Sequence, residues 1–203
     1  NCRGNYSIVN RDCSGNDGDA YNNLEDAINN LAGGDTLYIR SGTYSRPPTN
    51  DGSEGTLHIT ASGTADRHTV VSAYNNELVI IQARPGCNNY NPDPGDTSFT
   101  NSSHYYPNPA IIIQGSYIDV RGLKTYGQVV IHGHDITLEN CDLGGGGPHI
   151  HQGQVVFLVG YNLVVRNNKI HHSCWGESDA NGAALMGYDF SGIIENNEFY
   201  DNW

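Results

Sequence analysis

Positive charge is scarce in this sequence. Ten Lys and Arg residues stand against 22 Asp and Glu residues, which gives a formal net charge of −12 over 203 residues. A surface of this charge repels phosphate backbones, so nucleic acids are excluded as partners. An acidic polymer would need a bridging cation to bind.

Long apolar runs are also missing. No stretch approaches the about 18 uninterrupted apolar residues of a membrane-spanning helix, and no segment is rich in Lys and Arg. The sequence therefore predicts a soluble protein with no membrane span.

Methionine occurs once, whereas Gly occurs 25 times and Tyr 13 times. Gly, together with the abundant Asn and Asp, favours turns, and Tyr favours strands. The composition predicts an all-β protein, and the length predicts one domain.

The five cysteines, together with two glycosylation sequons at Asn5 and Asn101, are typical of an exported protein. Cys2 and Cys13 are close enough in sequence to cross-link the N-terminal segment. The odd cysteine must stay free or pair outside the chain. We therefore expect an extracellular or cell-surface glycoprotein whose targeting segment has been removed.

A repeat occupies the second half of the chain. Four segments share an apolar run, a glycine, a second apolar run, a charged residue and a polar turn: IIIQGSYIDVRGLKT, VVIHGHDITLENCDL, VFLVGYNLVVRNNKI and ALMGYDFSGIIENNEF. Their aligned glycines are Gly115, Gly133, Gly160 and Gly187. Constant strands separated by variable loops predict a solenoid.

The alignment puts residues of one kind into columns. One apolar column contains Val120, Leu138, Val165 and Ile194, and two outward columns alternate in charge: Arg121, Glu139, Arg166 and Glu195, then Lys124, Asp142, Lys169 and Glu198. The turn columns contain Asn140, Asn167 and Asn196, then Cys141, Asn168 and Asn197. We expect an asparagine ladder, with side-chain amides bonded between rungs about 4.8 Å apart.

A short helix precedes the strands, since Leu24, Ala27, Ile28 and Leu31 recur at helical spacing. The segment NNLEDAINNLAGGDTLYIRSGTY, followed by SGTADRHTVVSAY and IIENNEFYDN, resembles the cap and rungs of right-handed parallel β-helix proteins of the pectate-lyase-like superfamily. This resemblance predicts a single β-helix domain over residues 1–203, with residues 1–35 as the N-terminal cap segment. Residues 36–203 would form rungs that continue or stack beyond residue 203. An unrelated β-sandwich is the alternative fold.

The resemblance also implies where a substrate would bind. Family members with lyase activity build their cleft from the connections that precede the first strand of each rung. In this chain these connections are residues 83–109, 144–153 and 171–182.

The connections carry most of the candidate site residues. Tyr105, Tyr106 and Trp175 offer flat faces to sugar rings, and Glu177 and Asp179 offer oxygen ligands to Ca²⁺. His149 and His151 are candidate acid–base residues. Each of these side chains could instead be an ordinary part of a polar surface loop.

The resemblance implies lyase activity on acidic polysaccharide by β-elimination, with Lys or Arg as the base and Ca²⁺ as a cofactor. Lys169 is the candidate base, although its column neighbours Asp142 and Glu198 would keep it protonated and favour a structural role. A glycoside hydrolase is a further alternative, for which Glu177, Asp179 and Asp189 are the plausible carboxylates.

A non-catalytic function is the rival hypothesis. Strand alternation predicts that Ile112, Val130, Phe157 and Ala184 form an outward apolar stripe, while Ile113, Ile131, Leu158 and Leu185 point into the core. Such a stripe would be covered by a loop, a partner chain or an uncharged sugar surface. Self-assembly through this stripe or through an open C-terminal end would make the protein an adhesive or structural subunit of an extracellular assembly.

Overall fold

The computed structural model describes residues 1–45, 56–83, 109–145, 154–173 and 183–202. The chain divides into two compact units, Asn1–Leu31 and Ala32–Trp203. Every named strand within the described residues belongs to the second unit.

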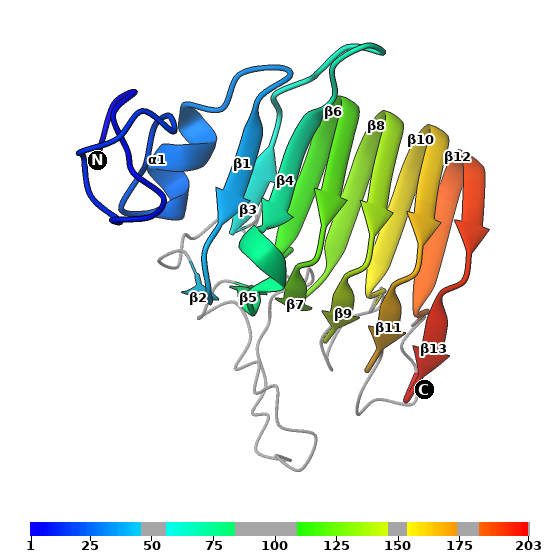
Figure 1. The fold of residues 1–203 in the computed structure, drawn as a ribbon. Coiled ribbons are helices and arrows are strands. Elements are labelled where there is room, and N and C mark those ends of the chain that lie inside the picture. Colours follow the sequence, from blue (N-terminus) through cyan, green and yellow to red (C-terminus); the bar gives the residue numbers. More distant parts are fainter. Residues whose placement is uncertain (46–55, 84–108, 146–153, 174–182, 203) are drawn as a thin grey trace, which may run out of the picture. The chain divides into compact units, whose positions relative to one another are not determined.

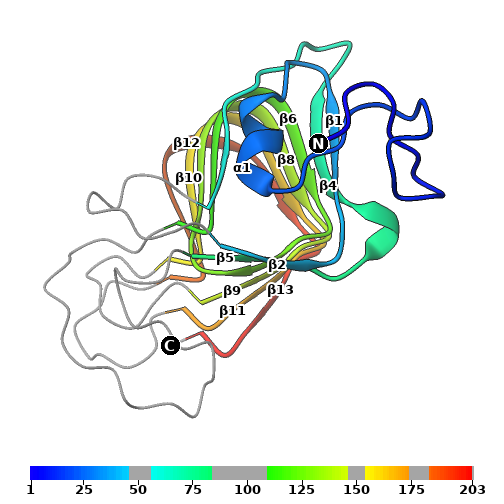
Figure 2. The same ribbon diagram turned by 90° about the vertical axis from the view of Figure 1, so that its left-hand side faces the viewer.

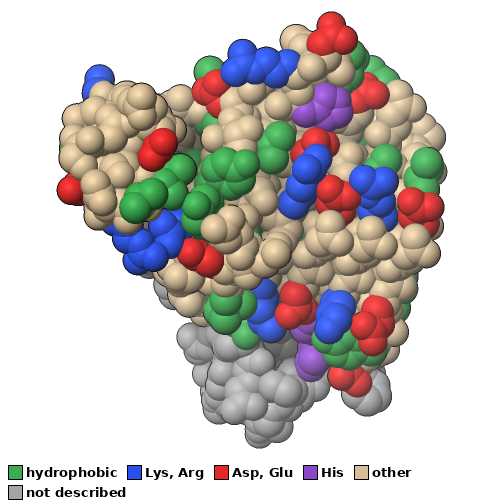
Figure 3. Space-filling view, viewed as in Figure 1, with side chains coloured by type: hydrophobic (Ala, Val, Ile, Leu, Met, Phe, Trp, Pro, Cys, Tyr) green, Lys and Arg blue, Asp and Glu red, His purple; other side chains and the backbone are tan. Residues whose placement is uncertain are grey.

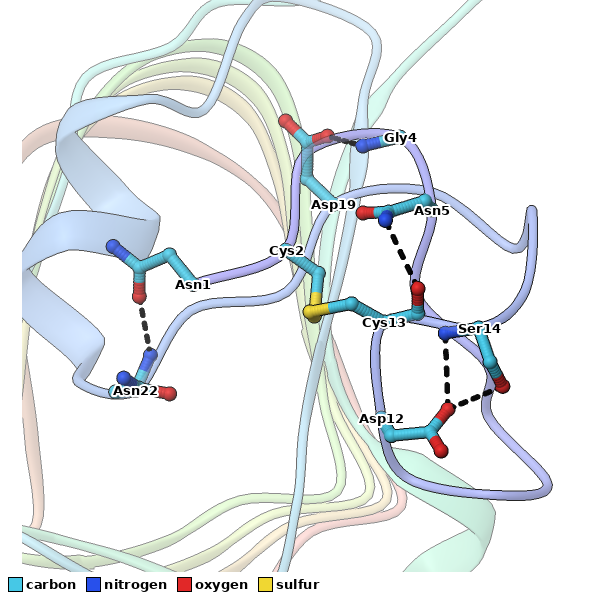
Figure 4. The surroundings of a disulfide bond; sticks show 9 residues. All are labelled: Asn1, Cys2, Gly4, Asn5, Asp12, Cys13, Ser14, Asp19 and Asn22. Atoms are coloured by element: carbon cyan, nitrogen blue, oxygen red, sulfur yellow. Dashed lines mark hydrogen bonds between the residues drawn. A yellow bond between two sulfur atoms is a disulfide. The ribbon is translucent and has the colours of Figure 1, made fainter.

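The N-terminal unit contains the predicted short helix, α1 (Leu24–Asn29). Asn23 caps it, because its side chain accepts a hydrogen bond from the Asp26 N–H at 2.7 Å. Cys2 and Cys13 form a disulfide (Figure 4), which closes a chain segment in a unit with few buried apolar side chains.

The second unit is built from parallel strands. Its elements in chain order are β1 (Thr36–Ile39), β2 (Gly42–Tyr44), β3 (Leu57–Ile59), β4 (Thr69–Ala73), a 3₁₀ turn (Tyr74–Asn76), β5 (Val79–Gln82), β6 (Ile111–Arg121), β7 (Lys124–Tyr126), β8 (Val129–Glu139), β9 (Asp142–Gly144), β10 (Val156–Arg166), β11 (Lys169–His171), β12 (Leu185–Glu195) and β13 (Glu198–Tyr200).

The strands form two sheets. The long-strand sheet has the order β1-β4-β6-β8-β10-β12, with β3 paired to β6, and the short-strand sheet has the order β13-β11-β9-β7-β5-β2. Successive long strands are therefore neighbours, as are successive short strands (Figure 1). The unit is a right-handed parallel β-helix, as predicted.

Each complete rung contains one 11-residue strand and one three-residue strand. Viewed along the β-helix, the long strand bends around one side of the section and the short strand closes the other (Figure 2). Near the middle of β6, β8 and β10, Gly115, Gly133 and Gly160 lie in register, each two residues before a residue with positive φ. A Cβ atom at Gly160 would overlap the carbonyl oxygen of Gly133, so this column requires glycine.

The core lies between the two sheets. Strand alternation sends fully buried side chains inward from the long strands, among them Ile113, Ile131, Leu158, Val120, Leu138 and Val165. Leu143 and Ile170 close the core from the short strands. The predicted inward parity of Ile113, Ile131 and Leu158 is confirmed.

The predicted register of the last rung is wrong before its glycine. Gly187 pairs with Leu158, and Phe190 takes the position opposite Gly160. Gly187 lies opposite the core residue Leu158 but has no side chain to fill the core there. The ring of Phe190 lies against it, where a Cβ atom would clash.

The second turn column forms the asparagine ladder. The Asn168 side chain accepts from the Cys141 N–H at 2.9 Å and donates to the Leu138 carbonyl at 2.9 Å. Asn197 repeats both kinds of bond one rung later, with the Asn168 N–H and the Val165 carbonyl.

The asparagines of the first turn column provide the backbone conformation of the turn. Asn140, Asn167 and Asn196 are in register and all have positive φ, at 55°, 55° and 53°. Asparagine tolerates this conformation better than other side chains. The predicted stacking of the three residues is confirmed, while the inter-rung amide bonds belong to the neighbouring column.

The predicted charge ladder is confirmed. Glu139 accepts from Arg121 Nε at 2.9 Å and from Arg166 Nε at 2.7 Å. Glu139 is 8% exposed, so its charge is compensated by the arginines of both neighbouring rungs. Lys, Arg, Asp and Glu side chains alternate in a row across this face (Figure 3).

No helix in the described part of the chain is long and apolar enough to cross a membrane.

Candidate functional site

The outer surface of the short-strand sheet brings several titratable side chains together. Thr125, Leu143 and Ile170 point into the core from the centres of β7, β9 and β11, so the flanking residues lie on the opposite face of the sheet, where His171 is 7% exposed. The strand register places these residues in two columns: Lys124, Asp142, Lys169 and Glu198, then Tyr126, Gly144, His171 and Tyr200.

Asp142 is the centre of this cluster. Its Oδ2 accepts from Lys124 Nζ at 2.8 Å, and its Oδ1 lies 2.7 Å from His171 Nε2. The hydrogen bond to His171, followed by that to Lys124, holds the pKa of Asp142 below its ordinary range. The same bond raises the pKa of Lys124, which is therefore a cation and a poor base.

Gly144 makes the contact between His171 and Asp142 geometrically possible. A Cβ atom at Gly144 would lie 2.5 Å from Cε1 of His171. Because Gly144 has no side chain, the imidazole of His171 has room to lie over β9 and contact the Asp142 carboxylate. Tyr200 lies against the ring of His171, at 4.7 Å between centroids and 20° between planes.

His172 extends the hydrogen-bonded chain. Nδ1 of His172 lies 2.6 Å from Nδ1 of His171. The backbone N–H of His172 donates to the Asp201 carbonyl at 3.1 Å. Burial is the largest cause that lowers the pKa of His172. His172 is consequently neutral near neutral pH.

The Asp142 carboxylate determines which nitrogen atoms of His171 and His172 donate and which accept. Asp142 only accepts, so His171 Nε2 carries the proton. When Nδ1 of His171 carries no proton, it accepts from the Nδ1–H of His172. Among the described residues none is hydrogen-bonded to Nε2 of His172, so in this arrangement its lone pair can accept a proton.

Most of the site residues predicted from sequence lie outside the described residues. They are His149, His151, Tyr105, Tyr106, Trp175, Glu177, Asp179 and Asn101. Their roles in catalysis, sugar binding, calcium binding and glycosylation stay predictions.

Two predicted residues lie in described segments. Lys169 is exposed and in register between Asp142 and Glu198, although the hydrogen-bonded cation of Asp142 is Lys124 of the preceding rung. Asn5 is exposed, and its amide donates to the Cys13 carbonyl at 2.9 Å (Figure 4). Asp189, the hydrolase candidate, is an exposed residue of β12 with a φ of 47°.

The sequence did not identify the Asp142, His171 and His172 cluster. The alignment predicts a structural charge column for Asp142 and places the two histidines in the connection of residues 171–182. The strand register could have revealed this cluster. It places His171 opposite Gly144, in the column next to the one that contains Asp142.

The predicted apolar stripe is confirmed for Ile112, Val130 and Phe157, which lie in register and are half-buried. Its fourth member is Met186, not Ala184, because of the register of the last rung. The adjoining column is more polar, with Gln114 and His132 followed by Val159 and Tyr188.

Within the segments that the structure describes, no group of three or more His, Cys, Asp or Glu residues is placed to hold a metal ion.

No family model, curated protein or solved structure matches this chain.

Proposed function

We propose that this protein is an exported, carbohydrate-binding β-helix that acts as a lyase on acidic polysaccharide, by β-elimination. The observation that carries the proposal is the hydrogen-bonded chain from Asp142 through His171 to His172. The resemblance of the rung sequences to the pectate-lyase-like superfamily supports it. The disulfide between Cys2 and Cys13 supports an extracellular or cell-surface location.

β-Elimination requires a base for the proton beside the uronate carboxyl group. Neutral His172 is suited to accept this proton at Nε2, and His171 and Asp142 then stabilise the imidazolium that forms. The electron pair of the C–H bond becomes a carbon–carbon double bond as the glycosidic oxygen leaves with the electrons of its C–O bond. This oxygen takes a proton from water, and His172 returns its proton to the hydroxide that remains.

The uronate carboxylate also requires a cation. Lys124 has three N–H donors, of which Asp142 takes one, so its ammonium group retains donors for a substrate carboxylate. Ca²⁺ held by Glu177 and Asp179 is the second source of positive charge in this proposal. Tyr105, Tyr106 and Trp175 would hold the sugar rings.

The test is an ultraviolet assay for unsaturated products on a panel of uronate polymers, with calcium and with a chelator. We expect product from at least one polymer, and a loss of about 100-fold or more in rate for His172→Gln. His68→Gln is the matched control, because His68 immediately precedes β4 and pairs at 3.1 Å with Asp119 of β6, away from the short-strand sheet. Full activity in His172→Gln would remove His172 as the base.

A non-catalytic structural or adhesive β-solenoid is the second candidate. The half-buried Ile112, Val130 and Phe157 stripe favours it, because stacked apolar side chains suit an assembly contact. Binding of a polymer without any unsaturated product would favour this function over the lyase.

A further inference from the structure

A second cluster of reactive side chains lies at the bend of the long strands, on a different sheet from Asp142 and His171. Ser116 of β6 and His134 of β8 are in register. Ser116 Oγ lies 2.7 Å from His134 Nε2, and His134 Nδ1 lies 2.7 Å from Asp135 Oδ2. A hydroxyl, an imidazole and a carboxylate are thus joined in series at hydrogen-bonding distance.

The carboxylate fixes the tautomer of the imidazole. The hydrogen bond from His134, followed by that from Asn162, lowers the pKa of Asp135, which is therefore an anion. An anionic carboxylate only accepts, so Nδ1 of His134 carries a proton and, in the neutral imidazole, Nε2 accepts from the Ser116 hydroxyl. This is the arrangement in which a histidine removes the proton of a serine nucleophile.

The β-helix holds the carboxylate from both sides. Asp135 adopts a φ of 55° just after the glycine bend, and Asn162 one rung later has the same conformation, with a φ of 54°. The Asn162 amide donates to Asp135 Oδ1 at 3.2 Å. Both carboxylate oxygens are therefore bonded, and only one of them faces the imidazole.

The imidazole is also fixed by aromatic contacts. Tyr161 stacks on His134 at 4.6 Å between centroids and 4° between planes, and Tyr117 meets its edge at 5.5 Å. The side chains of His134 and Asp135 remain 31% and 26% exposed, so a substrate can reach the cluster. Tyr161 is 53% exposed and offers a flat face beside it.

A donor for a developing oxyanion is present on the nucleophile itself. The Ser116 N–H donates to Ser62 Oγ at 3.1 Å. An acyl oxygen that displaced this hydroxyl would receive the same N–H, as in serine hydrolases that use the backbone N–H of their nucleophile.

We propose that Ser116, His134 and Asp135 form a serine-nucleophile site that hydrolyses carboxylic esters. Ser116 Oγ attacks the acyl carbon while His134 takes its proton, and this proton then passes to the departing alcohol. Water hydrolyses the acyl-serine by the same route, so that its proton passes through His134 back to Ser116 and the acid is released. The balance is ester plus water to acid plus alcohol, with no other reactant.

The test is covalent labelling of the full chain with a fluorophosphonate, followed by peptide mapping by mass spectrometry. We expect an adduct on Ser116, and labelling at least about 100-fold slower in His134→Gln and in Asp135→Asn. Ser72→Ala is the matched control, since Ser72 is a serine of the same sheet whose hydroxyl donates to the Ala73 carbonyl. It should label like the wild type.

Labelling of the wild type is informative even if a variant fails to fold. No adduct on Ser116 in the native protein would overturn the proposal. Equal labelling in folded His134→Gln would do the same, because the serine would then react without the histidine. Hydrolysis of p-nitrophenyl acetate that is lost in Ser116→Ala, while polymer cleavage by the His172 site continues, would separate the two activities.

Discussion

Single side chains hold the turns of this β-helix. Asn168 is 1% exposed and bonds a backbone N–H and a carbonyl that would otherwise be buried without partners. Asn167, its neighbour, is exposed and supplies the left-handed backbone conformation of the turn. Two adjacent asparagines therefore have different physical roles.

Replacement of Asn168 should be far more damaging than replacement of Asn167. We expect Asn168→Ala to lower the free energy of unfolding by about 2–4 kcal/mol, because it leaves the Cys141 N–H and the Leu138 carbonyl unsatisfied. Asn167→Gly, the matched control, should change it by less than about 0.5 kcal/mol, because glycine accepts positive φ. Chemical denaturation measures both, and equal losses would contradict these roles.

Acid should remove the contribution of Asp142 to stability. Its pKa in the folded protein is lowered chiefly by the bond from His171, below the unfolded value of about 3.9. The stabilisation is therefore complete above that value and is lost as the pH falls through the folded-state pKa. Denaturation at a series of pH values should show Asp142→Asn less stable than the wild type near neutrality, with the gap closing in strong acid. A gap that stays constant into strong acid would contradict the coupling.

Trp175 tests the sugar-binding hypothesis at one residue. We expect Trp175→Ala to weaken polysaccharide binding by about 1 kcal/mol or more, because stacking on the sugar ring is lost. Affinity electrophoresis measures the change, and circular dichroism should show the fold intact. Unchanged binding would remove Trp175 from the site.

At the level of elements, the β-helix depends on the close approach of its long strands at the bend. Gly133 and Gly160 bring backbone against backbone, where a side chain does not fit. The same bend places Ser116 against His134, because the residues after the glycines remain in register. The close packing of the long strands and the contact between Ser116 and His134 therefore both depend on this bend.

Alanine at this bend should destabilise the fold. We expect Gly160→Ala to lower the free energy of unfolding by at least about 2 kcal/mol, because its Cβ would overlap the Gly133 carbonyl and force the rungs apart. Gly122→Asn is the control at a second positive-φ glycine, at 68°, where the nearest atom to a Cβ is 3.5 Å away. It should be nearly neutral, since Asn140 and Asn167 occupy that position in later rungs.

At the level of the whole molecule, two kinds of outward column cover the β-helix. The charged columns contain ion pairs between rungs, such as those of Glu139 with Arg121 and Arg166. The Ile112, Val130 and Phe157 stripe instead presents half-buried apolar side chains. Only the second kind gains free energy from further burial.

Val130→Asp tests whether that stripe is covered. A carboxylate between Ile112 and Phe157 would have to be desolvated in a covered contact. We expect a lower mass in solution if a partner covers the stripe, or a lower melting temperature at unchanged mass if a loop covers it. Light scattering and thermal denaturation distinguish these outcomes. His132→Asp, at an exposed position of the same strand, should change neither, and no change in Val130→Asp would show that the stripe is uncovered.

Much of the fold was predictable from the sequence, because the rungs repeat. The columns of Val120, Leu138 and Val165 and of Arg121, Glu139 and Arg166 were aligned correctly from residue type alone. The alignment failed at Gly187, where a glycine without its usual bend was matched to Gly160. In the last rung the ring of Phe190 lies where a Cβ atom of Gly187 would be, and Phe190 takes the position opposite Gly160. No local sequence pattern predicts this change of register.

The sequence by itself determined the fold class, the register of most rungs and the inward parity of the core, since these depend on periodicity and on burial of apolar side chains. The tertiary structure decided which polar side chains meet. Asp142 reaches His171 across 29 residues, and Ser116 reaches His134 across 18. The separations follow from loop lengths that vary between rungs, and the contacts depend on which way each side chain leaves the strand. Both candidate sites therefore became visible only when the rungs were stacked.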